Sequence, residues 1–150
     1  MNVIAFDPGK ATGLACYTVF DTDGDFESMQ LDGGWAGQVD RLAENIGDYP
    51  WDHVICESFT VNAGTAKKDP SAYPDVFSLI GTIRYLAWAN GAEFHFQTPA
   101  EAKSFATNDK LRKLGWYKGA PGHADDASRH LLTFLAKNNY RPILERLTAP

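Results

Sequence analysis

Residues 2–9 read NVIAFDPG, a short apolar run that ends at an aspartate and is followed by Pro-Gly. The apolar run predicts a buried β-strand over residues 2–6, and the Asp-Pro-Gly triplet predicts the turn that ends it. A carboxylate beside such a strand is costly to bury unless it is paired or binds a metal. Asp7 is therefore a candidate functional residue, with capping of the turn through nearby backbone as the alternative.

The segments around this strand alternate between strand and helix patterns. Two further strands are expected at 13–20 and 26–33, joined by a hairpin turn at 22–25. A helix with Trp35, Val39, Leu42 and Ile46 on its buried side follows at 35–48. The predicted elements after it are a strand at 53–57, a long loop at 58–74, a helix at 75–90, a strand at 93–97, helices at 98–105, 108–114 and 123–137, and a short helix through Leu147.

This order predicts an α/β protein with a mixed five-stranded sheet flanked by helices. Three antiparallel strands come first, and the strands after them alternate with helices and are therefore expected to be parallel. The 75–90 helix is expected to bury the apolar side chains Val76, Phe77, Ile80, Ile83, Leu86 and Ala87. Thr98, Pro99 and Glu101 form a capping-box pattern for the helix that follows the last strand.

Length and composition favour one domain over residues 1–150. The chain is 44% hydrophobic, which is enough for one well-formed core. It contains no apolar run near 18 residues and does not begin like a signal peptide, so neither a membrane partner nor secretion is expected. Cys16 and Cys56 both lie in apolar strand patterns, which favours buried free thiols and a cytoplasmic protein.

Charge is distributed unevenly along the chain. The net charge is -5, but residues 1–57 hold eleven acidic and two basic residues, and residues 58–150 hold twelve basic and eight acidic ones. Such asymmetry indicates a polyanionic partner for the second part of the chain, with solvated turns and helix faces as the alternative. Trp116 and Tyr117 interleave with the basic stretch, where they would either stack on unpaired bases or belong to the core.

A group of acids and one histidine is a candidate metal site. Asp7 and Glu57 each end a predicted strand, and His123 and Asp126 are three residues apart, so they share a helical face. Asp125 points elsewhere on that helix but stays open as a fourth ligand. Glu57 could instead be a surface acid, and Asp125 and Asp126 could only favour the helix N-terminus. Carboxylates and imidazole without thiolates suit Mg²⁺ or Mn²⁺ better than zinc.

Four segments together resemble the RuvC-like Holliday junction resolvases of the ribonuclease H-like superfamily. They are IAFDPGKATGLA at 4–15, VICESF at 54–59, TPAEAKSF at 98–105 and HADDA at 123–127. The resemblance implies catalytic and metal-binding roles for Asp7, Glu57, His123 and Asp126, with two Mg²⁺ ions per site, and cleavage that leaves 5′-phosphates. It further implies a homodimer acting on branched DNA. Compact members of this kind resemble those of bacteriophages, which would place the protein in the host cytoplasm.

The expected DNA-contacting residues combine the basic stretch with one aromatic side chain. In this resemblance, Lys103 matches the family's lysine after its Pro-x-x motif, and Lys110 and Lys118 are the two alternatives for the second lysine. Phosphate neutralisation by such cations supplies most sequence-independent affinity for DNA. The predicted set is Phe59, Lys67, Lys68, Lys103, Lys110, Arg112, Lys113 and Lys118.

The leading hypothesis is a Mg²⁺-dependent endonuclease that resolves four-way junctions. Two alternatives stay open: a broader nuclease for flaps, bubbles or RNA–DNA hybrids, and a DNA-binding module without catalysis. An actin-like nucleotide-binding module is disfavoured because it needs a longer chain and a second phosphate-binding loop.

Overall fold

The computed structural model describes residues 1–20, 23–47, 49–61, 72–119 and 122–149, and it builds them around one mixed sheet. The first strand, β1 (Val3–Asp7), lies at its centre, and the strand order is β3-β2-β1-β4-β5. β2 (Thr12–Phe20) and β3 (Asp23–Leu31) pair antiparallel, whereas β4 (His53–Glu57) and β5 (Glu93–Gln97) run parallel to β1. The predicted sheet, antiparallel first and parallel afterwards, is confirmed.

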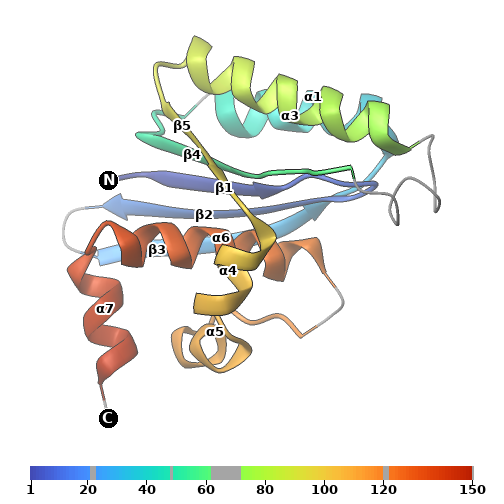
Figure 1. Ribbon diagram of the computed structural model, residues 1–150. Coiled ribbons are helices and arrows are strands. Elements are labelled where there is room, and N and C mark those ends of the chain that lie inside the picture. The colour runs from blue at the N-terminus through green and yellow to red at the C-terminus, as the bar shows by residue number, and fades with distance from the viewer. Residues whose placement is uncertain (21–22, 48, 62–71, 120–121, 150) are drawn as a thin grey trace.

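Helices cover both faces of the sheet (Figure 1). α1 (Gly34–Gly47) and α3 (Ala72–Ala89) lie side by side on one face. On the other face, α6 (His123–Lys137) packs along β1 and β2. α4 (Pro99–Phe105), α5 (Asn108–Leu114) and α7 (Arg141–Thr148) gather around α6.

The alternation of side chains along each strand divides the core into two parts. Ile4 and Phe6 of β1 pack in the cluster that includes α1 and α3, while Val3 and Ala5 pack in the cluster that includes α6. Because successive side chains of a strand point to opposite faces, Asp7 continues the row that faces α6. The strand pattern thus decides which helix can contact the acid at its end.

Three predicted details are wrong. The predicted turn at 22–25 extends too far, because residues 23–25 already belong to β3 and Asp23 pairs with Phe20. Trp35 is 44% exposed, and Gln38 is buried in its place, where it hydrogen-bonds to the Thr12 hydroxyl and to the Lys10 carbonyl oxygen. Phe77 of α3 is 48% exposed, whereas Leu79 is buried. In α1 and α3, the apolar side chains cover a wider part of the helix surface than the part that packs against the rest of the protein.

The remaining expectations on cysteines and helix caps agree with the structure. Cys16 and Cys56 are free; Cys56 is buried and Cys16 partly so. The capping box of α4 is present, with the Thr98 hydroxyl accepting from the Glu101 backbone and the Glu101 carboxylate accepting from the Thr98 backbone. Within the described ranges, no helix is both long and apolar enough to cross a bilayer.

Candidate active site

Three parallel strands end with polar side chains at one edge of the sheet. Asp7 ends β1, Glu57 ends β4 and Gln97 ends β5, and Glu57 and Gln97 are direct partners in the β4–β5 register. The parity of each strand points these three side chains toward α6, as it does for Val3, Ala5 and Ile55 of the same core. The ends of parallel strands are where open α/β sheets place their ligands.

The first turn of α6 brings a histidine to Asp7. His123 donates from Nδ1 to Asp7 Oδ2 at 2.7 Å, although 116 residues separate them. The close approach needs a glycine on β2, since a Cβ on Gly13 would lie 1.8 Å from the His123 carbonyl oxygen. The glycine of the ATG sequence at 11–13 therefore lets the start of α6 rest directly on the sheet beside Asp7.

Two turns further along α6, His130 reaches the other two strand ends. Its Nε2 donates to Glu57 Oε2 at 2.7 Å, and its Nδ1 lies 3.1 Å from Gln97 Oε1. The His130 side chain is 1% exposed, so it holds these groups from inside the protein. Sequence reasoning missed both His130 and Gln97. The available signals were a histidine seven residues after His123 and a polar residue at the end of a third strand.

The acids at this edge act on each other electrostatically. Burial raises the pKa of the Asp7 carboxyl, the hydrogen bond from His123 lowers it, and the negative charges of Glu57 and Asp126 raise it; the result is a pKa above the ordinary value. The hydrogen bond with Asp7 raises the pKa of His123 against the opposing effect of its partial burial. The field at the site therefore favours a positive charge.

Asp126 belongs to the same group but has basic partners. Arg129 donates from Nε to Asp126 Oδ1 at 3.1 Å and is itself anchored to the Ala106 carbonyl oxygen. Lys103 of α4 places its Nζ 3.4 Å from Asp126 Oδ2 while staying more than half exposed. A fixed guanidinium and an exposed ammonium thus lie at the border of the acidic group.

Asp125 is used differently. It is buried, and its two carboxylate oxygens accept from the backbone N–H groups of Lys118 and Gly119 at 3.0 and 3.2 Å. These bonds tie the segment before α6 to its first turn. Of the two open candidates for a fourth ligand, His123 lies against Asp7 and Asp125 does not.

The donor set suits a hard divalent cation. Three carboxylates and one imidazole converge here, and no thiolate is among them. Among the described residues, no three ligand atoms of Asp7, Glu57, His123 and Asp126 lie within 4.8 Å of one another. Each acid instead has a cationic or hydrogen-bonding partner, so binding a metal would exchange these contacts for metal ligation.

The basic residues predicted to contact DNA divide into two groups. Lys103 and Arg112 are exposed, and Arg112 lies over the Tyr117 ring. The ammonium groups of Lys110, Lys113 and Lys118 donate to the backbone carbonyl oxygens of Phe105, Ala149 and Ser28. Those three lysines therefore also connect α5 and its flanks to the rest of the protein. Lys67 and Lys68 lie outside the described residues.

The aromatic residues considered as DNA contacts differ in their burial. Trp116 is buried and stacks on Phe26 with ring centroids 4.2 Å apart, so it belongs to the core and is not a platform for bases. Phe59, two residues past Glu57, is half-buried and packs edge-on against Phe77 of α3 at 5.6 Å. It lies between the end of β4 and the exposed face of α3.

Comparison with known proteins identifies the fold. No protein-family model matches the sequence, and no curated protein matches it. Among solved structures, RuvC of Thermus thermophilus in complex with a Holliday junction substrate has a TM-score of 0.69 at 17% identity, over 93% of this chain and 96% of RuvC.

Two further Holliday junction resolvases have the same fold. The fowlpox virus resolvase has a TM-score of 0.57 at 15% identity, over 92% of this chain and 99% of its own. The yeast mitochondrial resolvase has a TM-score of 0.53 at 13% identity, over 97% of this chain and 79% of its own. The chain therefore has the fold of the RuvC-like resolvases, as its four motifs predicted.

Proposed function

We propose that this protein is a Mg²⁺-dependent endonuclease that resolves four-way junctions and related branched DNA. The observation that carries the proposal is the convergence of Asp7, Glu57, His123 and Asp126 at one edge of a RuvC-like sheet. Clustered carboxylates repel each other and also repel a phosphate, and a purely DNA-binding surface has no use for them. The same acids become useful when divalent cations neutralise them.

Asp7, Glu57, His123 and Asp126 would hold two Mg²⁺ ions, with Mn²⁺ as a substitute. When bound, two such ions would supply activation of the attacking water and stabilisation of the leaving 3′-oxygen, and the product would carry a 5′-phosphate. Asp7, on the central strand and within the electrostatic reach of both other acids, is the proposed shared ligand.

The remaining residues position these ligands. His130 and Gln97 fix the carboxylate of Glu57 from the buried side, and Arg129 fixes that of Asp126. Such outer contacts set the orientation of metal ligands and tune their affinity. Lys103, exposed beside Asp126, is the proposed contact to a phosphate of the DNA backbone.

We further propose a homodimer that pairs through α3. The outer face of this helix carries Phe77, Tyr85 and Trp88, which are 48%, 62% and 76% exposed. Gly81 lies between them with open space where a Cβ would be, so a second helix could approach closely. Apolar strips of this kind are typical of protein interfaces, and two copies would supply the two active sites that symmetric nicking requires.

A nicking assay on four-way junctions tests the activity. Each strand is labelled in turn, and the reaction is run with Mg²⁺, with Mn²⁺ and with EDTA. We expect paired nicks that a DNA ligase can reseal, because the products carry 5′-phosphates, and no cleavage in EDTA. Asp7→Asn should abolish cleavage while junction binding in a gel-shift assay persists. Glu44→Gln, an exposed acid on α1, is the matched control and should cleave normally.

Flap, bubble and RNA–DNA hybrid substrates are run in parallel with the junction. Equal rates on all of them would replace junction resolution with a broader nuclease activity. Binding without cleavage of any substrate, in either metal, would instead favour the non-catalytic module. Cleavage by Asp7→Asn near the wild-type rate would reject the proposed active site.

A further inference from the structure

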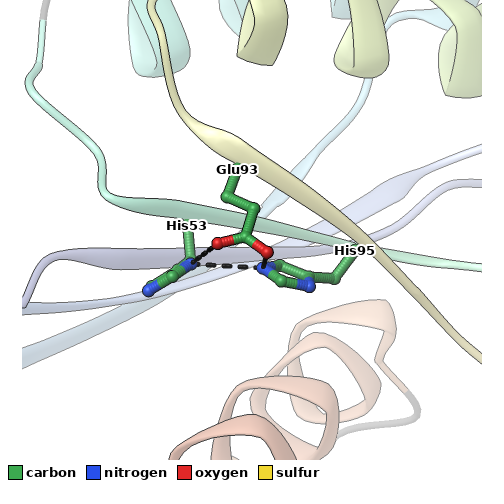
Figure 2. A group of neighbouring side chains, drawn as sticks. All are labelled: His53, Glu93 and His95. Atoms are coloured by element: carbon green, nitrogen blue, oxygen red, sulfur yellow. Dashed lines mark hydrogen bonds and ion pairs between the residues drawn. The ribbon is translucent and has the colours of Figure 1, made fainter.

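Three ligand-type side chains meet at the opposite end of β4 and β5 from the active site. They are His53, Glu93 and His95, and Figure 2 shows their polar atoms directed at one another. Among the residues that the structure describes, this is the group whose three ligand atoms all lie within 4.8 Å of each other. His53 and Glu93 start the two strands that end at Glu57 and Gln97, roughly 13 Å further along each strand by its rise per residue.

The sheet itself builds this group. His53 and Glu93 are direct partners in the parallel β4–β5 register, and His95 follows Glu93 by two residues. Side chains two apart on a strand, and partners across adjacent strands, share one face of the sheet. The two imidazoles pack against Phe134 of α6, with ring centroids 5.0 and 4.9 Å from that of Phe134, and this packing restricts their positions.

The distances within the group match those around a single metal ion. His53 Nδ1 lies 3.1 Å from His95 Nε2, and these atoms lie 3.6 and 3.7 Å from the Glu93 carboxylate oxygens. Two nitrogen ligands at about 2.05 Å from a tetrahedral Zn²⁺ are about 3.3 Å apart. Small side-chain rotations therefore convert the observed contacts into ligation by three protein groups.

The chemistry of the group favours a transition metal over Mg²⁺. Two imidazoles and one carboxylate are a common donor set for Zn²⁺ and its neighbours, whereas Mg²⁺ prefers oxygen ligands. Burial lowers the pKa of His95, the charge of Glu93 opposes that effect, and His53 adds to it, so the pKa lies below the ordinary value. A neutral imidazole is the form that binds metal.

We propose that His53, Glu93 and His95 form a second metal site that binds Zn²⁺ or a similar transition-metal ion, separate from the active site. With three protein ligands, the ion keeps one position for water. The ion joins the edge strand β5 to β4 and so stabilises the folded protein, because a ligand that binds the folded state raises its stability.

Zinc titration of the full-length, EDTA-treated protein tests the site. Isothermal titration calorimetry with ZnCl₂ should find one equivalent that is weakened at least about tenfold in His95→Gln and in Glu93→Gln. Glu93 is 69% exposed, so its variant should fold even if substitution of a histidine disturbs packing on Phe134. Zn²⁺ should raise the thermal unfolding temperature of the wild type and not that of the two variants. Co²⁺ should give the visible absorption of a tetrahedral site only where zinc binds.

Two control variants separate this site from other sources of zinc binding. Asp7→Asn alters the active site and should keep the zinc equivalent, and Glu27→Gln, an exposed acid on β3, should also keep it. Unchanged zinc affinity in both His95→Gln and Glu93→Gln would overturn the proposal. So would loss of the zinc equivalent in Asp7→Asn, because the metal would then occupy the active site. Either of these two results would reject the zinc site and leave the nuclease proposal intact, since the nuclease proposal depends on residues at the other end of the strands.

Discussion

At the scale of single residues, His130 contacts both side chains at two strand ends whose backbones the sheet already pairs. Its ring lies between Glu57 and Gln97 and is almost completely buried. A carboxylate with one fixed partner loses less freedom when it binds a cation than a mobile surface acid does. His130 is therefore a positioning residue for the proposed ligand Glu57.

Replacing His130 with Gln should lower nicking activity by about 10- to 100-fold, the usual effect of losing an outer contact to a metal ligand. The informative measurement is the Mg²⁺ concentration for half-maximal rate, which should rise because Glu57 is no longer held. Junction affinity in a gel-shift assay should not change. A variant that loses only thermal stability, with an unchanged Mg²⁺ requirement, would show that His130 is merely part of the core.

At the scale of elements, the start of α6 is positioned by its contact with β2. The Gly13 Cα lies so close to the helix that a methyl group would overlap the His123 carbonyl oxygen and crowd the Ala124 amide, at 1.8 and 2.8 Å. Both are backbone atoms, which cannot move aside as a flexible side chain can. The distance between His123 and Asp7 thus depends on a residue that has no side chain.

We expect Gly13→Ala to displace the first turn of α6 and to lower the free energy of unfolding by about 1–3 kcal/mol, the usual cost of overpacking. Nicking should fall at least about tenfold, since His123 and Asp126 move with that turn. Denaturant unfolding and the nicking assay provide the two measurements. Gly47→Ala is the control, because a Cβ there meets open space. Wild-type activity in Gly13→Ala would contradict the proposed role of Gly13 in positioning the first turn of α6.

The contact between α4 and α6 makes the stability of the folded protein depend on pH. The backbone N–H of Thr98, and then the ammonium of Lys137 on α6, lower the pKa of Glu101 from 4.5 to about 2. Because the folded pKa lies below the unfolded one, this stabilisation is complete above pH 4.5 and is lost as the pH falls toward 2.

Glu101→Gln should remove this contribution, so its unfolding free energy should fall less steeply than that of the wild type between pH 4.5 and 2. At neutral pH the variant should be the less stable of the two. Denaturant titrations at several pH values provide the comparison. Parallel curves for the two proteins over that range would contradict the role assigned to the contacts of Glu101 with Thr98 and Lys137.

At the scale of the whole molecule, the outer face of α3 determines whether two copies associate. Trp88→Glu puts a charge on the proposed interface without entering the core, since Trp88 is largely exposed. The dissociation constant of the dimer in sedimentation velocity should rise at least about tenfold, as for a central aromatic residue of an interface. A wild-type protein that stays monomeric at micromolar concentration would contradict the dimer.

The cleavage pattern of this variant distinguishes an effect on dimerisation from an effect on the active site. The monomeric variant should still nick single strands, because Asp7, Glu57, His123 and Asp126 all come from one chain. Paired nicks within one junction should become rare. Loss of all nicking would mean that the α3 face contributes to the site itself.

Local pattern was enough to predict the order of the elements. The apolar run before Asp7, the HVICE and EFHFQ strands and the capping box at Thr98 each depend on neighbours in sequence, and all lie where expected. The four motifs also identified the fold, which the solved resolvase structures share at identities of 13–17%. Strand-end acids were recognisable because a carboxylate after a buried strand is costly unless it has a partner.

Only the tertiary structure decided which side chains become partners. His130 reaches Glu57 across 73 residues, and Asp125 turns to backbone amides although it neighbours Asp126. Trp35 and Phe77 fit an apolar helical pattern, yet they are exposed because the sheet covers only part of each helix. The His53–Glu93–His95 group likewise arises from strand register. Periodicity along a chain records which face is apolar, but contact depends on the packing of distant segments, which no local pattern encodes.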